Sequence, residues 1–258
     1  MGILIKNGIV VTMRQNNNLI LDGAVYIEGN KIIDVGESNE IESKYRNKKL
    51  DKTINARNKA IFPGFINLHT HSVLSILRGQ AEDEPSYKSV YEKMFPITDI
   101  MTEEDIYHMA KLGYLELLKF GSTTIVDHFG SKGEYLAKAA LEMGIRAYLN
   151  DTILDVDQKK MKDKVYEYNA SIGERTLNSS VDFIKKWHMA KDGLIRAILV
   201  PHAPDTCSFQ LLKDIANIAK KYNLSITLHL AQNITEVEQV KKKVQSNSRR
   251  ILGKYWYF

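Results

Sequence analysis

The chain has 258 residues, of which 44% are hydrophobic and 26% charged, a composition that fits one soluble globular domain or one and a half. A single cysteine, Cys207, excludes an internal disulfide and indicates the cytoplasm. We find no signal peptide, and no apolar run approaches the roughly 20 residues that a membrane helix requires. The net charge is +5, but three of the basic residues lie in the last fifteen residues (244–258), which contain no acid. Because the sequence also has no patch of aromatic and basic residues, we expect no nucleic-acid partner.

Residues 1–59 alternate short apolar runs with turn signals. The runs are rich in isoleucine and valine, and Asn7-Gly8 and Gly29-Asn30 separate them. Such punctuation is typical of β-hairpins. We therefore expect a small all-β unit in this part of the chain.

From residue 60 onward, strands are predicted to alternate with helices. An apolar, largely buried strand should run from residue 60 to His69, and Thr102, followed by three acids, should begin a helix that stops at Gly121. The remaining strands are predicted at residues 123–127, 146–149, 195–200 and 225–230, and the remaining helices at residues 132–143, 180–189 and 209–222. This alternation predicts a parallel sheet, for which a closed (β/α)₈ barrel is the leading candidate, with five of its eight strands present.

Histidines recur at the ends of these strands, where the active site of a barrel lies. His69 and His71 are separated by one residue, so both point to the same side of the first strand and could bind one metal ion. Taken alone, such a pair is more often two surface or hydrogen-bonded histidines than a metal site, by roughly three to one. His128 follows the second strand, where it could line a pocket or have a structural role.

Two further histidines lie at or near strand ends. His202 follows the fourth strand, and His229 lies near the end of the fifth. The other two histidines, His108 and His188, fall in helical stretches, and we interpret them as surface or packing residues.

Three motifs carry a resemblance to a known family. Residues 64–71 read GFINLHTH, residues 202–208 read HAPDTCS, and residues 229–233 read HLAQN with EVE at residues 236–238. In this order they resemble the amidohydrolase superfamily, in particular its deaminase and chlorohydrolase branch, where the last two motifs are HAPYTCS and HLAE…EVE. That branch includes deaminases of S-adenosylhomocysteine and methylthioadenosine, guanine deaminase and triazine hydrolases, and the resemblance covers residues 1 to about 243.

The resemblance implies a fold, a metal and a reaction. The fold would be a (β/α)₈ barrel preceded by a small β-sandwich, and His69, His71 and His229 would hold Zn²⁺, with Fe²⁺ as the alternative. The ion would lower the pKa of a bound water, giving a hydroxide that attacks an sp² carbon carrying an amino or chloro group. His202 would bind the substrate, a small molecule such as an aminated heterocycle. The oligomeric state, a homo-oligomer included, is left open.

The sequence departs from the family at two positions near this site. Gln232 stands where the branch carries its proton-shuttling glutamate, and an amide can orient a substrate but cannot act as a general base. We therefore assign Gln232 to substrate binding and leave the catalytic residue unknown. Asn150-Asp151-Thr152 stands where adenosine-type deaminases often carry an arginine, so S-adenosylhomocysteine is not assigned as the substrate.

The family pattern also predicts a histidine on strand six and an aspartate on strand eight, for which 258 residues leave no room. We expect residues 1–59 to be part of the β-sandwich, residues 60–243 to be a partial barrel, and residues 244–258 to be an aberrant tail. A one-base frameshift near Lys243 would explain the tail, with a natural extension as the alternative. The predicted function is a metal-dependent hydrolase of C–N bonds other than peptide bonds, and the alternative is a catalytically inactive truncated fragment.

Overall fold

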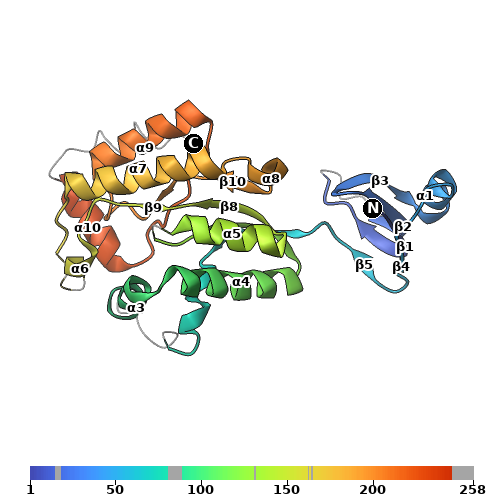
Figure 1. Cartoon of the computed structure of the whole chain (residues 1–258), viewed down its shortest axis with the longest axis horizontal. Helices are drawn as coiled ribbons and strands as arrows, with labels where there is room; N and C mark the ends of the chain where they lie inside the picture. Colours follow the sequence, from blue (N-terminus) through green and yellow to red (C-terminus); the bar gives the residue numbers. More distant parts are fainter. Residues whose placement is uncertain (15–18, 81–88, 131, 162, 164, 246–258) are drawn as a thin grey trace. The chain divides into compact units, whose positions relative to one another are not determined.

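A computed structural model of the chain describes residues 1–14, 19–80, 89–130, 132–161, 163 and 165–245 (Figure 1). The chain divides into two compact units, Met1–Gly64 and Phe65–Phe258. Across the described ranges, no helix combines the length and apolar character that crossing a membrane requires. The predicted aberrant tail lies outside the described residues apart from its first two positions.

The first unit is a five-stranded sheet with one helix. The sheet has the order β3-β2-β1-β4, and β5 also pairs with β1. Strands β1 and β2, like β2 and β3, are antiparallel, whereas β4 and β5 run parallel to β1. The elements are β1 (Gly2–Val11), β2 (Leu19–Glu28), β3 (Lys31–Glu37), α1 (Ser38–Tyr45), β4 (Lys52–Asn55) and β5 (Ala60–Ile61).

One of the two predicted turns in this unit is correct. Gly29 has φ +65° and links β2 to β3 as a hairpin. Asn7-Gly8 is not a turn, because β1 continues through it with an irregular register that Asn7 accommodates at φ +62°. Helix α1 packs on β2, and Tyr26 of the sheet stacks on Tyr45 of the helix with ring centroids 3.9 Å apart.

The second unit is an α/β structure built on a parallel sheet with the order β10-β8-β7-β6 and a second parallel pair, β11-β9. In Figure 1, helices α4, α5, α7 and α9 lie in that order from bottom to top. The strands are β6 (Phe65–Thr70), β7 (Ser122–His128), β8 (Arg146–Asn150), β9 (Thr152–Ile153), β10 (Ile195–Ala197) and β11 (Val200–Pro201). The helices are η1 (Ser72–Leu77), η2 (Ser89–Met94), α3 (Phe95–Ile100), α4 (Glu103–Lys119), α5 (Gly133–Met143), α6 (Gln158–Met161), α7 (Ala170–Trp187), α8 (Ala190–Gly193), α9 (Phe209–Tyr222) and α10 (Ile234–Gln245).

The predicted helix signals are confirmed where capping chemistry is strong. Thr102 and Asp105 form a reciprocal capping box at the start of α4. Gly144, at φ +69°, ends α5. Ser208 caps α9, whose bounds are the predicted ones. Helix α7 begins ten residues before the predicted start, at the Asn169 cap.

Three predicted strands differ in the structure. The one expected at residues 195–200 is two short strands in different sheets, β10 (Ile195–Ala197) and β11 (Val200–Pro201). The stretch from residue 60 to the histidines is two strands, because β5 pairs with β1 of the first unit and β6 begins only after Pro63-Gly64. Strand β6 is not buried: it is the edge of its sheet, and the side chains of Phe65 and Leu68 are exposed. Residues 225–230 form only one isolated parallel bridge, between Leu199 and Ile226, rather than a full fifth strand.

The core of the second unit lies between the sheet and helices α4, α5 and α7. Tyr114 of α4, Ile125 of β7, Leu136 of α5 and Leu149 of β8 are fully buried there. Helix α5 packs on α4 and β8, and α7 packs on β9 and β10. This packing fixes the ends of β6, β7 and β11, from which the histidines project.

Candidate metal centre

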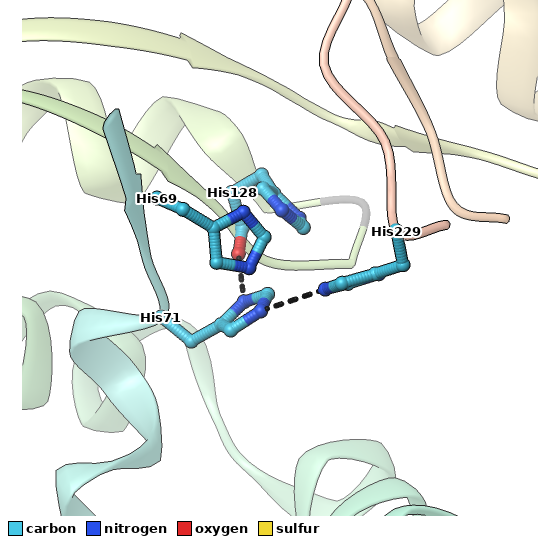
Figure 2. A group of neighbouring side chains, drawn as sticks. All are labelled: His69, His71, His128 and His229. Carbon is cyan, nitrogen blue, oxygen red and sulfur yellow. Dashed lines mark hydrogen bonds between the residues drawn. The ribbon is translucent and has the colours of Figure 1, made fainter. Parts of the chain in front are cut away.

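Four histidines converge at the carboxyl end of the parallel sheet (Figure 2). His69 and His71 come from the end of β6, His128 ends β7, and His229 reaches the group from the loop before α10. One ring nitrogen of each residue lies within 4.8 Å of those of all the others. The first three meet because β6 and β7 are parallel neighbours, with Thr70 opposite Asp127.

Hydrogen bonds fix the orientation of two of these rings. The Nδ1 atom of His71 lies 3.2 Å from the carbonyl oxygen of His128, and Nδ1 of His229 lies 3.1 Å from the carbonyl oxygen of His202. A carbonyl only accepts, so each Nδ1 carries the proton. Each Nε2 then holds a lone pair, as in metal-binding histidines whose other nitrogen donates to a backbone carbonyl.

These two Nε2 atoms, of His71 and His229, face each other 3.1 Å apart (Figure 2). Burial lowers the pKa of each ring to about 4, so neither ring carries a second proton at neutral pH. Two lone pairs at this distance repel unless a cation lies between them. Two imidazole nitrogens bound to one tetrahedral zinc ion lie about 3.3 Å apart. The donor set therefore fits a divalent metal ion.

The other two histidines complete the group. His128 is 2% exposed, its Nε2 is buried without a hydrogen-bond partner, and burial together with the neighbouring histidines lowers its pKa. His69 is exposed, and its ring centroid lies 4.9 Å from those of both His71 and His229. A buried imidazole nitrogen without a partner is the kind of group that a metal ion would satisfy.

The structure thus brings His69, His71 and His229 together and adds His128, for which the sequence left two roles open. His202 is buried, and the centroid of its ring lies 5.2 Å from the centroid of the His229 ring. Its Nδ1 lies 3.0 Å from Oγ1 of Thr206. Burial is the main cause that lowers the pKa of His202 to about 3, so the ring is neutral.

The remaining predicted residues are also placed. Gln232 is half-buried two residues beyond Leu230, and its amide nitrogen is buried without a hydrogen-bond partner. The two histidines expected outside the site lie outside it. His108 is on α4 beside Glu104, and Nδ1 of His188 accepts a hydrogen bond from the backbone of Ala197.

Sequence reasoning assigned no role to Asp127, which positions the start of η1 directly after His71. Its fully buried carboxylate accepts hydrogen bonds from the backbone N–H of Ser72, at 3.2 Å, and from the Ser72 hydroxyl. Burial raises the pKa of Asp127. Gly113 of α4 packs against Ser72, because a Cβ at position 113 would lie 2.7–2.9 Å from atoms of Ser72. The only sequence signal was the place of Asp127 beside His128 at a strand end.

Residues 60–252 match the amidohydrolase family. The chain belongs to this family. It is 34% identical over 255 residues to a 5-methylthioadenosine/S-adenosylhomocysteine deaminase of Halothermothrix orenii, a match that covers 98% of this chain and 55% of that protein. The chain therefore spans about half the length of the curated relatives that it matches.

Solved structures with the same fold include two enzymes of Arthrobacter aurescens. A triazine hydrolase superposes with a TM-score of 0.81 at 20% identity, over 98% of this chain and 58% of that one. The atrazine chlorohydrolase TrzN, complexed with zinc, superposes with a TM-score of 0.76 at 21% identity, over 93% and 58% of the two chains. Together with the family match, these neighbours support the predicted α/β fold of the TIM-barrel type.

Proposed function

We propose that the chain carries the histidine part of a metal-dependent hydrolase site that cleaves a C–N bond other than a peptide bond. The amino group of an aminated heterocycle is the proposed target. The observation that carries this proposal is the pair of Nε2 lone pairs of His71 and His229, which face each other 3.1 Å apart in neutral rings. The deaminase names of the relatives and the zinc of one structural neighbour point the same way.

His69, His71 and His229 would hold the ion, with His128 as a further ligand or a neighbour that excludes water. Zinc is the proposed ion, and iron is the alternative. When bound, the ion would supply a hydroxide nucleophile at neutral pH by lowering the pKa of a coordinated water. The backbone carbonyls of His128 and His202 orient two of the rings towards it.

Substrate binding is assigned to His202 and Gln232. A neutral, buried His202 can donate or accept one hydrogen bond to a ring nitrogen of a heterocycle. The unpartnered amide nitrogen of Gln232 can donate to a second acceptor on the same molecule. Neither residue can take up a proton readily at neutral pH, so the proton-transfer group of this site is unassigned.

Ammonia release from a panel of aminated purines, pyrimidines and triazines tests this proposal. The zinc-loaded chain is compared with its H229A variant and with Q232E, which restores the carboxylate of the family pattern. We expect release that H229A abolishes and that Q232E increases. Zinc binding without release by the native chain or by Q232E would favour the alternative, a metal-binding but catalytically inactive chain.

Three further assignments stay proposals of the same kind. Residues 1–59 would be part of a small β-sandwich, and residues 60–243 would be part of a barrel. A cytoplasmic location rests on the single cysteine, Cys207, which is buried and whose pKa burial raises to about 12.

A further inference from the structure

The segment that carries His229 and Gln232 is held at its first residue by the neighbouring strand end. The backbone N–H of His229 donates to the carbonyl oxygen of His202 at 3.0 Å, and the His229 ring donates to the same oxygen. The chain then turns at Ala231, which has φ +56°. A non-glycine residue in this left-handed region is strained, so surrounding contacts must stabilise the turn.

Glu236 supplies those contacts at the other end of the turn. Glu236 lies on α10 and is 1% exposed. Its two carboxylate oxygens accept hydrogen bonds from the backbone N–H of Ala231, at 2.8 Å, and from that of Gln232, at 2.7 Å. In return, the side chain of Asn233 accepts the backbone N–H of Glu236 at 2.9 Å. Buried hydrogen bonds to an ionised acceptor are short and strong, so this arrangement holds the turn rigidly.

The burial of Glu236 and the engagement of both its oxygens with the backbone favour a structural role over proton transfer in the absence of the usual glutamate at position 232. Each of its oxygens is already bound to a backbone N–H of the turn. A carboxylate engaged in this way fixes the path of the backbone between His229 and the start of α10.

We propose that Glu236 is a positioning residue that sets the turn at residues 230–232 and, through it, the ring of His229 and the amide of Gln232. The part of this inference that concerns a metal rests on the proposed function of the histidine cluster. The part that concerns the turn does not.

The test uses the full chain with E236Q, E236A and the control E238Q, which changes an exposed glutamate on the same helix. In E236Q one amide oxygen can accept one of the two N–H groups, while the new –NH₂ opposes the other. We expect hydrogen exchange at the amides of Ala231 and Gln232 in the metal-free chain to be at least about 10-fold faster in E236Q than in the native chain. E238Q should match the native chain.

Zinc affinity and the visible spectrum of bound Co²⁺ give the second readout. We expect zinc to bind about 10-fold more weakly to E236Q, the usual size of an effect on groups that orient metal ligands, with an altered Co²⁺ spectrum. The inference would be overturned if the amides of Ala231 and Gln232 exchanged as slowly in E236Q as in the native chain. It would also be overturned if they exchanged faster but zinc affinity and the Co²⁺ spectrum stayed as in the native chain. If the native chain binds no metal, the proposed function fails, and the exchange measurement alone decides the role of Glu236. E236Q carries the test if E236A does not fold.

Discussion

Replacing Gly113 by alanine tests how helix α4 holds the segment after His71. In an ordinary helix interior this change stabilises a protein by about 1 kcal/mol, because glycine is the more flexible residue in the unfolded chain. In this structure the added Cβ would lie 2.7 Å from Cβ, 2.8 Å from the carbonyl oxygen and 2.9 Å from Cα of Ser72. Two of these three atoms are backbone, so no side-chain rotation relieves the overlap.

The magnitude follows from the distance that the Ser72 backbone must move. Ordinary contact between carbon atoms begins near 3.5 Å, so Ser72 or α4 must retreat by roughly 0.8 Å to relieve the 2.7 Å contact. Overpacking of this kind costs about 1–3 kcal/mol. This cost exceeds the stabilisation of about 1 kcal/mol from replacing a helical glycine, because the hydrogen bonds of Ser72 to the buried Asp127 resist the movement. We expect G113A to be destabilised by about 1 kcal/mol and to bind zinc about 10-fold more weakly, since His71 directly precedes Ser72.

Urea unfolding of the metal-free chain and zinc titration measure the two effects. The control is L112A, which changes the preceding, exposed residue of α4 and leaves the contact with Ser72 intact. A G113A chain that is more stable than the native one by about 1 kcal/mol, with unchanged zinc affinity, would refute the reasoning.

Two further predictions concern other parts of the second unit. T102A removes the hydroxyl that accepts the backbone N–H of Asp105 at 3.1 Å, and it should lower the free energy of unfolding by about 1 kcal/mol; an unchanged urea midpoint would contradict the role of the cap. Burial, and then the charge of Glu236, raises the pKa of Asp205 to about 6 from 3.8. The folded chain therefore holds this proton more tightly, and the resulting stability is present below pH 3.8 and lost as the pH rises through 6. D205N, which is neutral at every pH, should match the native chain near pH 4 and be more stable at pH 7.5. Equal urea midpoints of the two chains at pH 7.5 would contradict the raised pKa.

The sequence predicted those features that short-range chemistry decides. The N-cap at Thr102, the C-cap at Gly144 and the bounds of α9 depend on residues near each other in the chain, and all are confirmed. His69 and His71 were predicted to act together because a strand repeats every two residues. The order of strands and helices was likewise sufficient to predict the parallel sheet.

The sequence did not predict those features that long-range packing decides. Helix α7 begins before its predicted start, in a stretch that contains Gly173, a poor helix former that lies against Asp155 of the neighbouring loop. The exposure of β6 follows from its place at the sheet edge, which no local pattern encodes.

The role of His128 was ambiguous for the same kind of reason. A histidine at a strand end can point into a shared site or away from it, and only the parallel register of β6 and β7 brings its ring beside His71. Glu236 was visible in the sequence as part of a family motif. Its contacts with the turn depend on how the loop after His229 folds back on α10.

Zinc stoichiometry tests the central claim, that the facing histidines form a metal site, most directly. The purified full chain, its H71A/H229A variant and the control H108A are dialysed against zinc and then against metal-free buffer, and the retained metal is measured. We predict about one tightly bound ion per chain in the native protein and in H108A, and none in H71A/H229A. A native chain that retains no zinc, or a double variant that retains as much as the native chain, would contradict the account.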